Sequence, residues 1–297
     1  MYIFATNLEY VKITLYSKFY LIAFVLGMLA TSASDGIAQT NSPKSVTREK
    51  GKVYMYWGWN RGWYTKSRIH FDGNDYDFTL DEVIAKDRQS KFSFNDYFNP
   101  GRITIPQYNF RIGYMVNSHW DISIGADHMK YVVQQSQSVN ISGRIANSNT
   151  LYDGTYQEDD IIVQKGFLEF EHTDGLNYEN LEIRRWDGLL KKDKIKLSLN
   201  EGLGIGAMVP RTNTTLLNKA RYDEFHLAGF GASAVGALNL MFFNVIFVQT
   251  EFKVGYINMP NIRTTIHKSD HADQDFLFAQ WNVVFGAMLD LNRFAKK

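Results

Sequence analysis

The chain has 297 residues, a formal net charge of +1 at pH 7, 15% aromatic residues and no cysteine. The balanced charge argues against nucleic acid as a partner, and no basic stretch interleaves with aromatic residues as it does in single-strand binders. Without cysteine, these residues form neither a disulfide framework nor a thiolate site.

The first predicted element is a secretory signal peptide over residues 1–38. Two lysines precede an uninterrupted apolar run over residues 19–30, and Gly36-Ile37-Ala38 fits the small-x-small rule for cleavage. A membrane anchor is the alternative, but spanning requires about 20 apolar residues. We therefore expect export, with residues 39–297 forming the mature protein.

The mature sequence alternates between apolar and polar residues with a period of two. The alternating segments have about the ten residues that a tilted membrane strand needs. No stretch has the continuous apolar length of a membrane-spanning helix, so the expected fold class is all-β. Eight segments are predicted to be strands: Lys52–Tyr64, Thr104–Val116, Trp120–Gln134, Leu176–Leu189, Lys194–Met208, Tyr222–Leu240, Val245–Asn258 and Asp275–Asn292.

The connections between these segments alternate in length. Outer-membrane barrels have short periplasmic turns and long extracellular loops, with an even number of strands in bacteria. The pattern therefore predicts a closed antiparallel transmembrane β-barrel of about eight strands in the bacterial outer membrane. The short connections are 117–119, 191–193 and 242–244, and the long polar ones are 65–103, 135–175, 209–221 and 259–274. Within 65–103, Arg68–Phe71 and Tyr76–Leu80 are expected to pair as a hairpin.

The two faces of each predicted strand differ in polarity. In the third segment, Ile122 and Ile124 alternate with Asp121, Ser123 and Asp127. A face of charges and glycines cannot form the core of a soluble sandwich without a heavy desolvation cost, but it can line a barrel surrounded by lipid. A periplasmic β-sandwich remains the alternative. Aromatic residues near strand ends are expected to form interfacial girdles: Trp57, Trp59, Tyr114, Trp120 and Trp186.

Charges of both signs are predicted to face the barrel interior. Eight strands leave an interior just wide enough for side chains to fill, and buried charges persist when they are paired. The favoured interpretation is a structural network that plugs the lumen, and the alternative is a gated ion or proton path, that is, a narrow pore. The predicted interior polar network is Arg111, Asp121, Asp127, Glu182, Arg184, Glu251 and Lys253.

A candidate rim site consists of His128, Lys130 and His226. By alternation, His128 and Lys130 point outward near the outer rim, where they would meet solvent or lipopolysaccharide phosphates. Asp127 points to the opposite face from His128, so the two do not form a catalytic dyad. No catalytic residue is assigned, and no metal or cofactor is expected, since the His267 and His271 pair lies in a polar loop without a helical pattern.

Three stretches resemble recurrent motifs of uncharacterised outer-membrane barrels from Bacteroidota: Tyr54–Arg61, Pro106–Tyr114 and Gly125–Tyr131. The overall pattern resembles the small outer-membrane barrels that include the OmpA transmembrane domain, PagP and PagL. This resemblance is architectural and implies no reaction. The expected function is non-enzymatic, with loops that bind a surface ligand, lipopolysaccharide or a partner protein. The alternatives are a lipid A-modifying enzyme with its site at the outer rim and a narrow pore.

Overall fold

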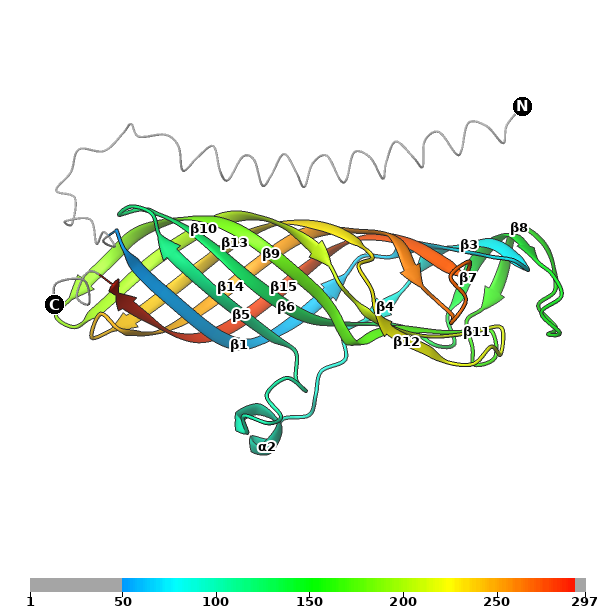
Figure 1. The fold of residues 1–297 in the computed structure, drawn as a ribbon, viewed down its shortest axis with the longest axis horizontal. Coiled ribbons are helices and arrows are strands. Elements are labelled where there is room, and N and C mark those ends of the chain that lie inside the picture. Colours follow the sequence, from blue (N-terminus) through cyan, green and yellow to red (C-terminus); the bar gives the residue numbers. More distant parts are fainter. Residues whose placement is uncertain (1–49, 292–297) are drawn as a thin grey trace, which may run out of the picture. The chain divides into compact units, whose positions relative to one another are not determined.

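The structure, a computed structural model, describes residues 50–291, and the predicted signal peptide lies outside them. Eight antiparallel strands form a closed ring, because the last one pairs with the first (Figure 1). In ring order they are β1 (Lys52–Tyr64), β5 (Tyr108–Met115), β6 (Trp120–Val133), β9 (Leu168–Lys192), β10 (Ile195–Met208), β13 (Gly229–Phe242), β14 (Ile246–Arg263) and β15 (His271–Asp290).

The ring confirms the predicted fold class and excludes the sandwich. Each of its strands corresponds to one predicted segment, in the predicted order. The main error concerns the sixth segment, since residues 222–240 are not one strand. Here β12 (Tyr222–Phe225) pairs with β11 (Arg211–Leu216), and the ring strand β13 starts at Gly229. A Cβ on Gly229 would stand 2.0 Å from the carbonyl oxygen of Asn258, so this close approach to β14 requires glycine.

Short connections gather at one end of the ring, here called the turn end. β9 and β10 are joined through Asp193, and β13 and β14 through Phe243 and Asn244. These three residues have φ values of 48°, 54° and 61°, as tight hairpin turns require. The described chain also begins and finishes at this end, where the amide of Leu291 donates to the carbonyl of Gly51 at 3.2 Å.

At the opposite end, the connections predicted as long polar loops are mostly β-structure. The expected hairpin is confirmed, because β2 (Ser67–Gly73) pairs with β3 (Tyr76–Val83). It continues through β7 (Ser138–Ile145) to β8 (Gly154–Ile162), and β2 joins it to β15. These strands, together with β4 (Ala85–Lys86), β11, β12 and the adjoining parts of β6, β9, β14 and β15, are called the extension.

The extension has its own apolar core. Alternation along β2 and β3 buries one face, with Phe71 and Phe78 stacked at a centroid distance of 5.2 Å. The "polar" stretches therefore contain a half-buried strand pattern whose outer face is polar. The extension core includes Ile69, Phe71, Phe78, Leu80, Tyr131, Ile141, Phe167, Phe170, Leu176, Ile257, Met259 and Phe276.

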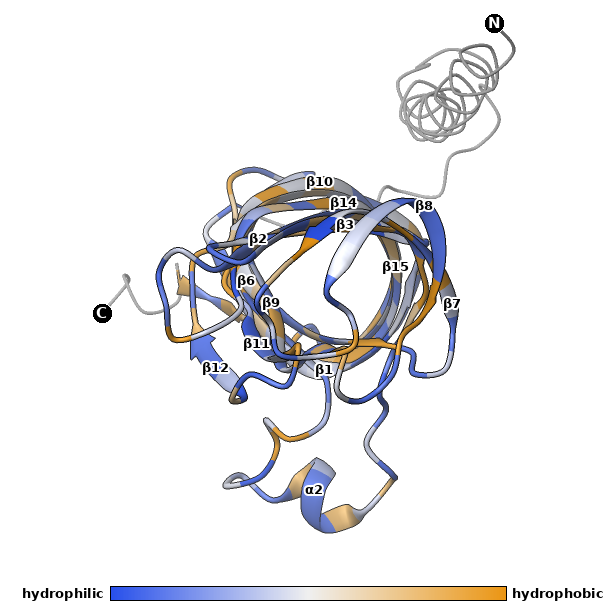
Figure 2. Ribbon diagram, turned by 90° about the vertical axis from the view of Figure 1, so that its right-hand side faces the viewer, coloured by the Kyte–Doolittle hydropathy of each residue, from blue (hydrophilic) through white to orange (hydrophobic). Residues whose placement is uncertain are grey.

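A short helix, α2 (Phe94–Phe98), lies in the connection between β4 and β5. Ser93 caps it by accepting a hydrogen bond from the amide of Asp96 at 3.1 Å. Both the side view and the end view place α2 outside the ring (Figures 1 and 2). Within residues 50–291, no helix is long and apolar enough to cross a membrane.

Candidate functional site

All seven predicted interior charges lie inside the ring, and none is more than 2% exposed. Three are cations and four are carboxylates. They come from four different strands, so the network links β5, β6, β9 and β14 across the lumen as well as along the wall. Charges buried to this extent persist only when they are paired and hydrogen-bonded.

Glu182 on β9 is the centre of this network. Its Oε1 lies 2.8 Å from Nη2 of Arg111 and 2.9 Å from Nζ of Lys253. Its Oε2 lies 2.6 Å from Nη2 of Arg184. One carboxylate is thus bound by all three interior cations, so its loss would leave three buried positive charges without their shared partner.

Glu251 on β14 forms a second centre beside the first. Its Oε1 lies 2.6 Å from Nη1 of Arg184 and accepts the hydroxyl of Tyr56 at 3.0 Å. The amide of Asn282 donates to Oε2 at 3.0 Å, and that of Gln249 donates to Oε1 at 2.6 Å. The lone pairs that the single ion pair leaves free are therefore satisfied by neutral donors.

The other two carboxylates bind at the flanks of the network. Asp127 contacts Lys253 and accepts the amide of Asn180 at 3.1 Å. Asp121 accepts the hydroxyl of Tyr54 at 3.1 Å and also bonds to the indole nitrogen of Trp186. Each predicted interior charge thus has a polar partner on another residue.

Glycines on β10 make room for these large side chains. A Cβ on Gly202 would lie 2.7 Å from Cγ of Arg184, and one on Gly204 would lie 2.7 Å from Cγ of Glu182. These alternate glycines therefore face the arginine and glutamate that fill the lumen.

Apolar layers close the ring on both sides of the network. At the turn end, Phe247 packs against Tyr54 and Tyr56, with both centroid distances at 6.5 Å. At the other end, the extension core covers the network. The lumen is thus filled in three layers, and the turn-end cluster consists of Tyr54, Tyr56, Met115, Trp186, Met241, Phe247, Val284 and Met288.

Sequence reasoning missed some neutral members of the network and misplaced one tryptophan. Trp186 is 3% exposed and points inward, because it shares its parity along β9 with Glu182 and Arg184. The other four predicted girdle residues lie on the outer wall. The same parity rule identifies the missed polar residues: Tyr54, Tyr56, Asn60 and Asn180.

The three predicted rim residues have different surroundings in the structure. His128 is not a solvated rim residue but is 8% exposed, stacked on Tyr108 at 4.8 Å, with Nδ1 2.8 Å from Oδ1 of Asn177. Lys130 donates to the carbonyl of Ile105 at 2.8 Å. His226 lies between β12 and β13 rather than on a ring strand, because β12 turns away to pair with β11.

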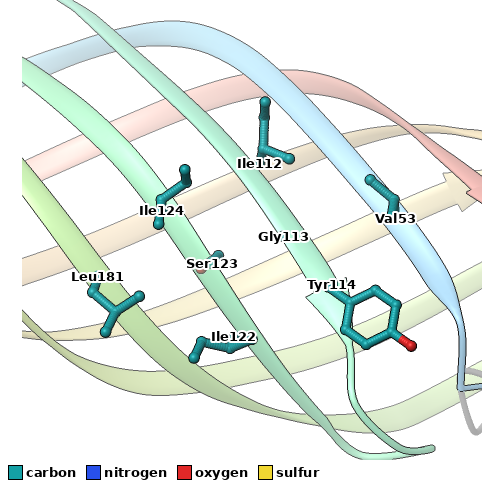
Figure 3. Close-up of a pocket in the computed structure, with 8 residues that line it drawn as sticks. All are labelled: Val53, Ile112, Gly113, Tyr114, Ile122, Ser123, Ile124 and Leu181. Atoms are coloured by element: carbon teal, nitrogen blue, oxygen red, sulfur yellow. The ribbon is translucent and has the colours of Figure 1, made fainter.

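The outer wall of the ring is apolar. Ile124 is 63% exposed and Ile205 is 66% exposed, in strands whose inner faces are polar. Figure 3 shows outward side chains around a shallow apolar depression over β5 and β6. Its lining contains no acid–base pair, and the wall residues in it are Val53, Ile112, Tyr114, Ile122, Ile124 and Leu181.

A closed antiparallel ring with an apolar outer wall and a paired charged interior defines a transmembrane β-barrel. No known family and no curated protein matches the sequence, so the resemblance to Bacteroidota barrels stays a prediction.

Solved structures with a similar arrangement include outer membrane proteins. For OprG from Pseudomonas aeruginosa the identity is 10% and the TM-score 0.33, covering 82% of this chain and 98% of that one. For AlkL in lipid bilayers the identity is 8% and the TM-score 0.36, covering 86% of this chain and 97% of that one. For Ail of Yersinia pestis the identity is 10% and the TM-score 0.29, covering 81% of this chain and 99% of that one. At such TM-scores these likenesses add nothing to what the ring itself defines.

Proposed function

We propose that this protein is an integral outer-membrane barrel with a closed lumen, and that it acts by presenting its extension as a binding surface outside the cell. The filled lumen carries this proposal. Three successive layers of side chains occupy the interior, so the interior supplies structure and leaves recognition to the extension. The extension is an ordered sheet, which provides the rigid scaffold that a binding surface needs.

Strand β8 is the part of the extension best suited to a protein partner. It is the last strand in the path from β15 through β2, β3 and β7, and nearly all of its residues are exposed. An edge strand offers backbone groups to which an extended segment can add. Its Glu158, Asp159 and Asp160 make that edge acidic, so a basic segment is the complementary partner.

Binding to an extended peptide of alternating lysine and valine tests this surface. The barrel would be held in lipid nanodiscs, and binding measured by surface plasmon resonance. Replacement of Glu158, Asp159 and Asp160 by lysine should lower the affinity for the peptide at least about tenfold, since like charges then face each other. The same replacement at Asp187, Asp193 and Asp290, near the turn end, is the matched control and should change little. Equal losses in both variants would contradict a site on β8.

Lipopolysaccharide binding and lipid A modification are the alternative proposals at the outer rim. One observation favours a reactive group there, since Nε2 of His226 is buried without a hydrogen-bond partner. Mass spectrometry of lipid A from overexpressing and deletion strains tests the enzyme. An altered acyl count that disappears with His226→Ala or His128→Ala would establish it, and an unchanged lipid A would exclude it.

A narrow pore is the third alternative. Single-channel recording in planar bilayers should show no large, steady conductance, because the polar network and both apolar layers occupy the lumen. A stable conductance would refute the closed barrel. Variants of the network, such as Glu251→Ala, would then show whether the ion path passes through these charges.

A further inference from the structure

The connection between β4 and β5 folds back along the outside of the ring. Its first part is fixed to β1, where the amide of Gly62 donates to Oδ2 of Asp87 at 2.9 Å and Gln89 donates to the carbonyl of Asn60 at 3.2 Å. Further on, the chain forms α2 beside the wall (Figures 1 and 2). Residues 91–102, which include α2, are called the α2 loop.

The α2 loop touches the apolar wall through aromatic rings. The ring of Trp59 lies 5.5 Å from that of Tyr97 and 5.3 Å from that of Phe98. On the wall itself, Trp59 packs against Phe285 at 5.9 Å. The aromatic surface of the loop therefore continues the surface that the barrel presents to lipid.

Three phenylalanines of the α2 loop have little protein cover. Phe92 is 67% exposed, Phe94 is 75% exposed and Phe98 is 56% exposed. Their rings form one cluster, because Phe94 lies 5.4 Å from Phe92 and 5.6 Å from Phe98. A contiguous exposed aromatic patch of this kind marks an interaction surface, and its continuity with the lipid-facing wall identifies the apolar phase as the membrane.

Charges at both limits of the loop fit the edge of a bilayer. Lys91 precedes the aromatic cluster, and Arg102 follows it with Nη2 2.8 Å from Oδ1 of Asp96. Arg61, the next outward residue of β1 after Trp59, is exposed. Aromatic rings flanked by lysine and arginine are typical of the interface, where the rings enter the acyl layer and the cations meet headgroup phosphates.

We propose that the α2 loop is a lipid-binding finger that inserts Phe92, Phe94 and Phe98 among the acyl chains beside the barrel, with Lys91 and Arg102 at the headgroups. This inference rests on the proposed membrane location of the barrel. The finger sets how deep the barrel sits, because its rings must stay at the level of Trp59. It also covers part of the wall that would otherwise face free lipid.

The absence of cysteine makes the test direct. Three single-cysteine variants would be labelled with bimane and reconstituted in vesicles whose lipids carry bromine on their acyl chains: Phe94→Cys in the loop, Ile124→Cys on the wall and Leu151→Cys in the extension, where Leu151 is 86% exposed. Bromine should quench the labels at 94 and 124 to within about twofold of each other, since both would meet acyl chains. The label at 151 should keep its fluorescence.

The same three labels separate the two proposals. Quenching at 124 but not at 94 would overturn the lipid-binding finger while leaving the membrane barrel intact. Absence of quenching at 124 would overturn the membrane location and the finger with it. As a further control, Phe92→Ser combined with Phe98→Ser in the Phe94→Cys background should reduce quenching at 94 at least twofold, because none of the three phenylalanines then remains to hold the label among the acyl chains.

Discussion

Strand β9 passes through both regions of the molecule, and its two halves show opposite chemistry. In the extension, Leu168 and Phe170 face inward with 0% and 1% exposure, while Glu169 faces outward. In the ring, Glu182 is buried inside and Leu181 is 45% exposed outside. The even-numbered residues are the buried ones in both 168–172 and 176–186, so the backbone alternation is the same and only the polarity of each face changes.

This difference shows that the surrounding phase decides which face is polar. In the extension, apolar side chains escape water by packing together, as in a soluble protein. In the ring, the outer wall meets hydrocarbon and needs no protein cover, which leaves the interior to groups that satisfy one another. Removal of a buried side chain should therefore destabilise the two regions in different ways.

The largest expected effect is in the ring. Glu182→Ala leaves Arg111, Arg184 and Lys253 without their common partner, and breaking a buried pair from one side costs about 3–5 kcal/mol. Urea unfolding of the reconstituted barrel should register this loss. The control is Glu171→Ala on the same strand. Glu171 is partly exposed and pairs with Arg88, so its loss should lower the free energy of unfolding by only about 0–1 kcal/mol. Equal effects of the two substitutions would mean that the lumen is hydrated.

A comparable change in the extension should stay local. Phe78 is 1% exposed, and Phe→Ala in a core costs about 3–5 kcal/mol. Phe78→Ala should make β2 and β3 sensitive to protease while the ring still migrates as a folded, heat-modifiable species on a gel. Unfolding of the whole barrel in one step would contradict the division into two regions.

The extension should also weaken in acid. Burial lowers the pKa of His172 to about 4, against a smaller opposing hydrogen bond from Gln274. The folded state thus favours the neutral imidazole of His172. Its contribution to the stability of the extension is complete above pH 6.5 and is lost as the pH falls toward 4, with a total loss of about 3 kcal/mol. Protease sensitivity of the extension between pH 7 and 4 measures this, and His172→Gln should remove most of the dependence.

A smaller effect of the opposite sign is expected at the surface of the extension. Partial burial lowers the pKa of His70, but hydrogen bonds to Asp77 and Asp273 outweigh it and leave the pKa raised. The pairing of β2 with β15 should therefore weaken as the pH rises above 6.5 through the raised value. Because the site is partly exposed, the change should stay within about 1 kcal/mol. Hydrogen exchange of β2 amides checks it, with His70→Asn as the control.

The ring was largely predictable from sequence because its signal is local. Alternation of period two identified the segments that form its strands, and it placed residues such as Arg111 and Glu251 inside. Most of the extension was hidden because its outer face is polar on average. Apart from the predicted hairpin, its alternating apolar residues, such as Ile141 and Phe170, were taken for parts of loops. The contacts of His226 and of the α2 loop depend on pairing between distant segments, which no local pattern records.

Nitroxide labels on the outer face of β9 test the central claim most directly. Glu169→Cys and Leu181→Cys have the same parity along one strand, one in the extension and one in the ring. In vesicles, the label at 181 should be more accessible to oxygen, which concentrates in lipid, and the label at 169 to a water-soluble nickel chelate. The same preference for the chelate at both positions would contradict the account, because the two halves of the strand would then face one solvent.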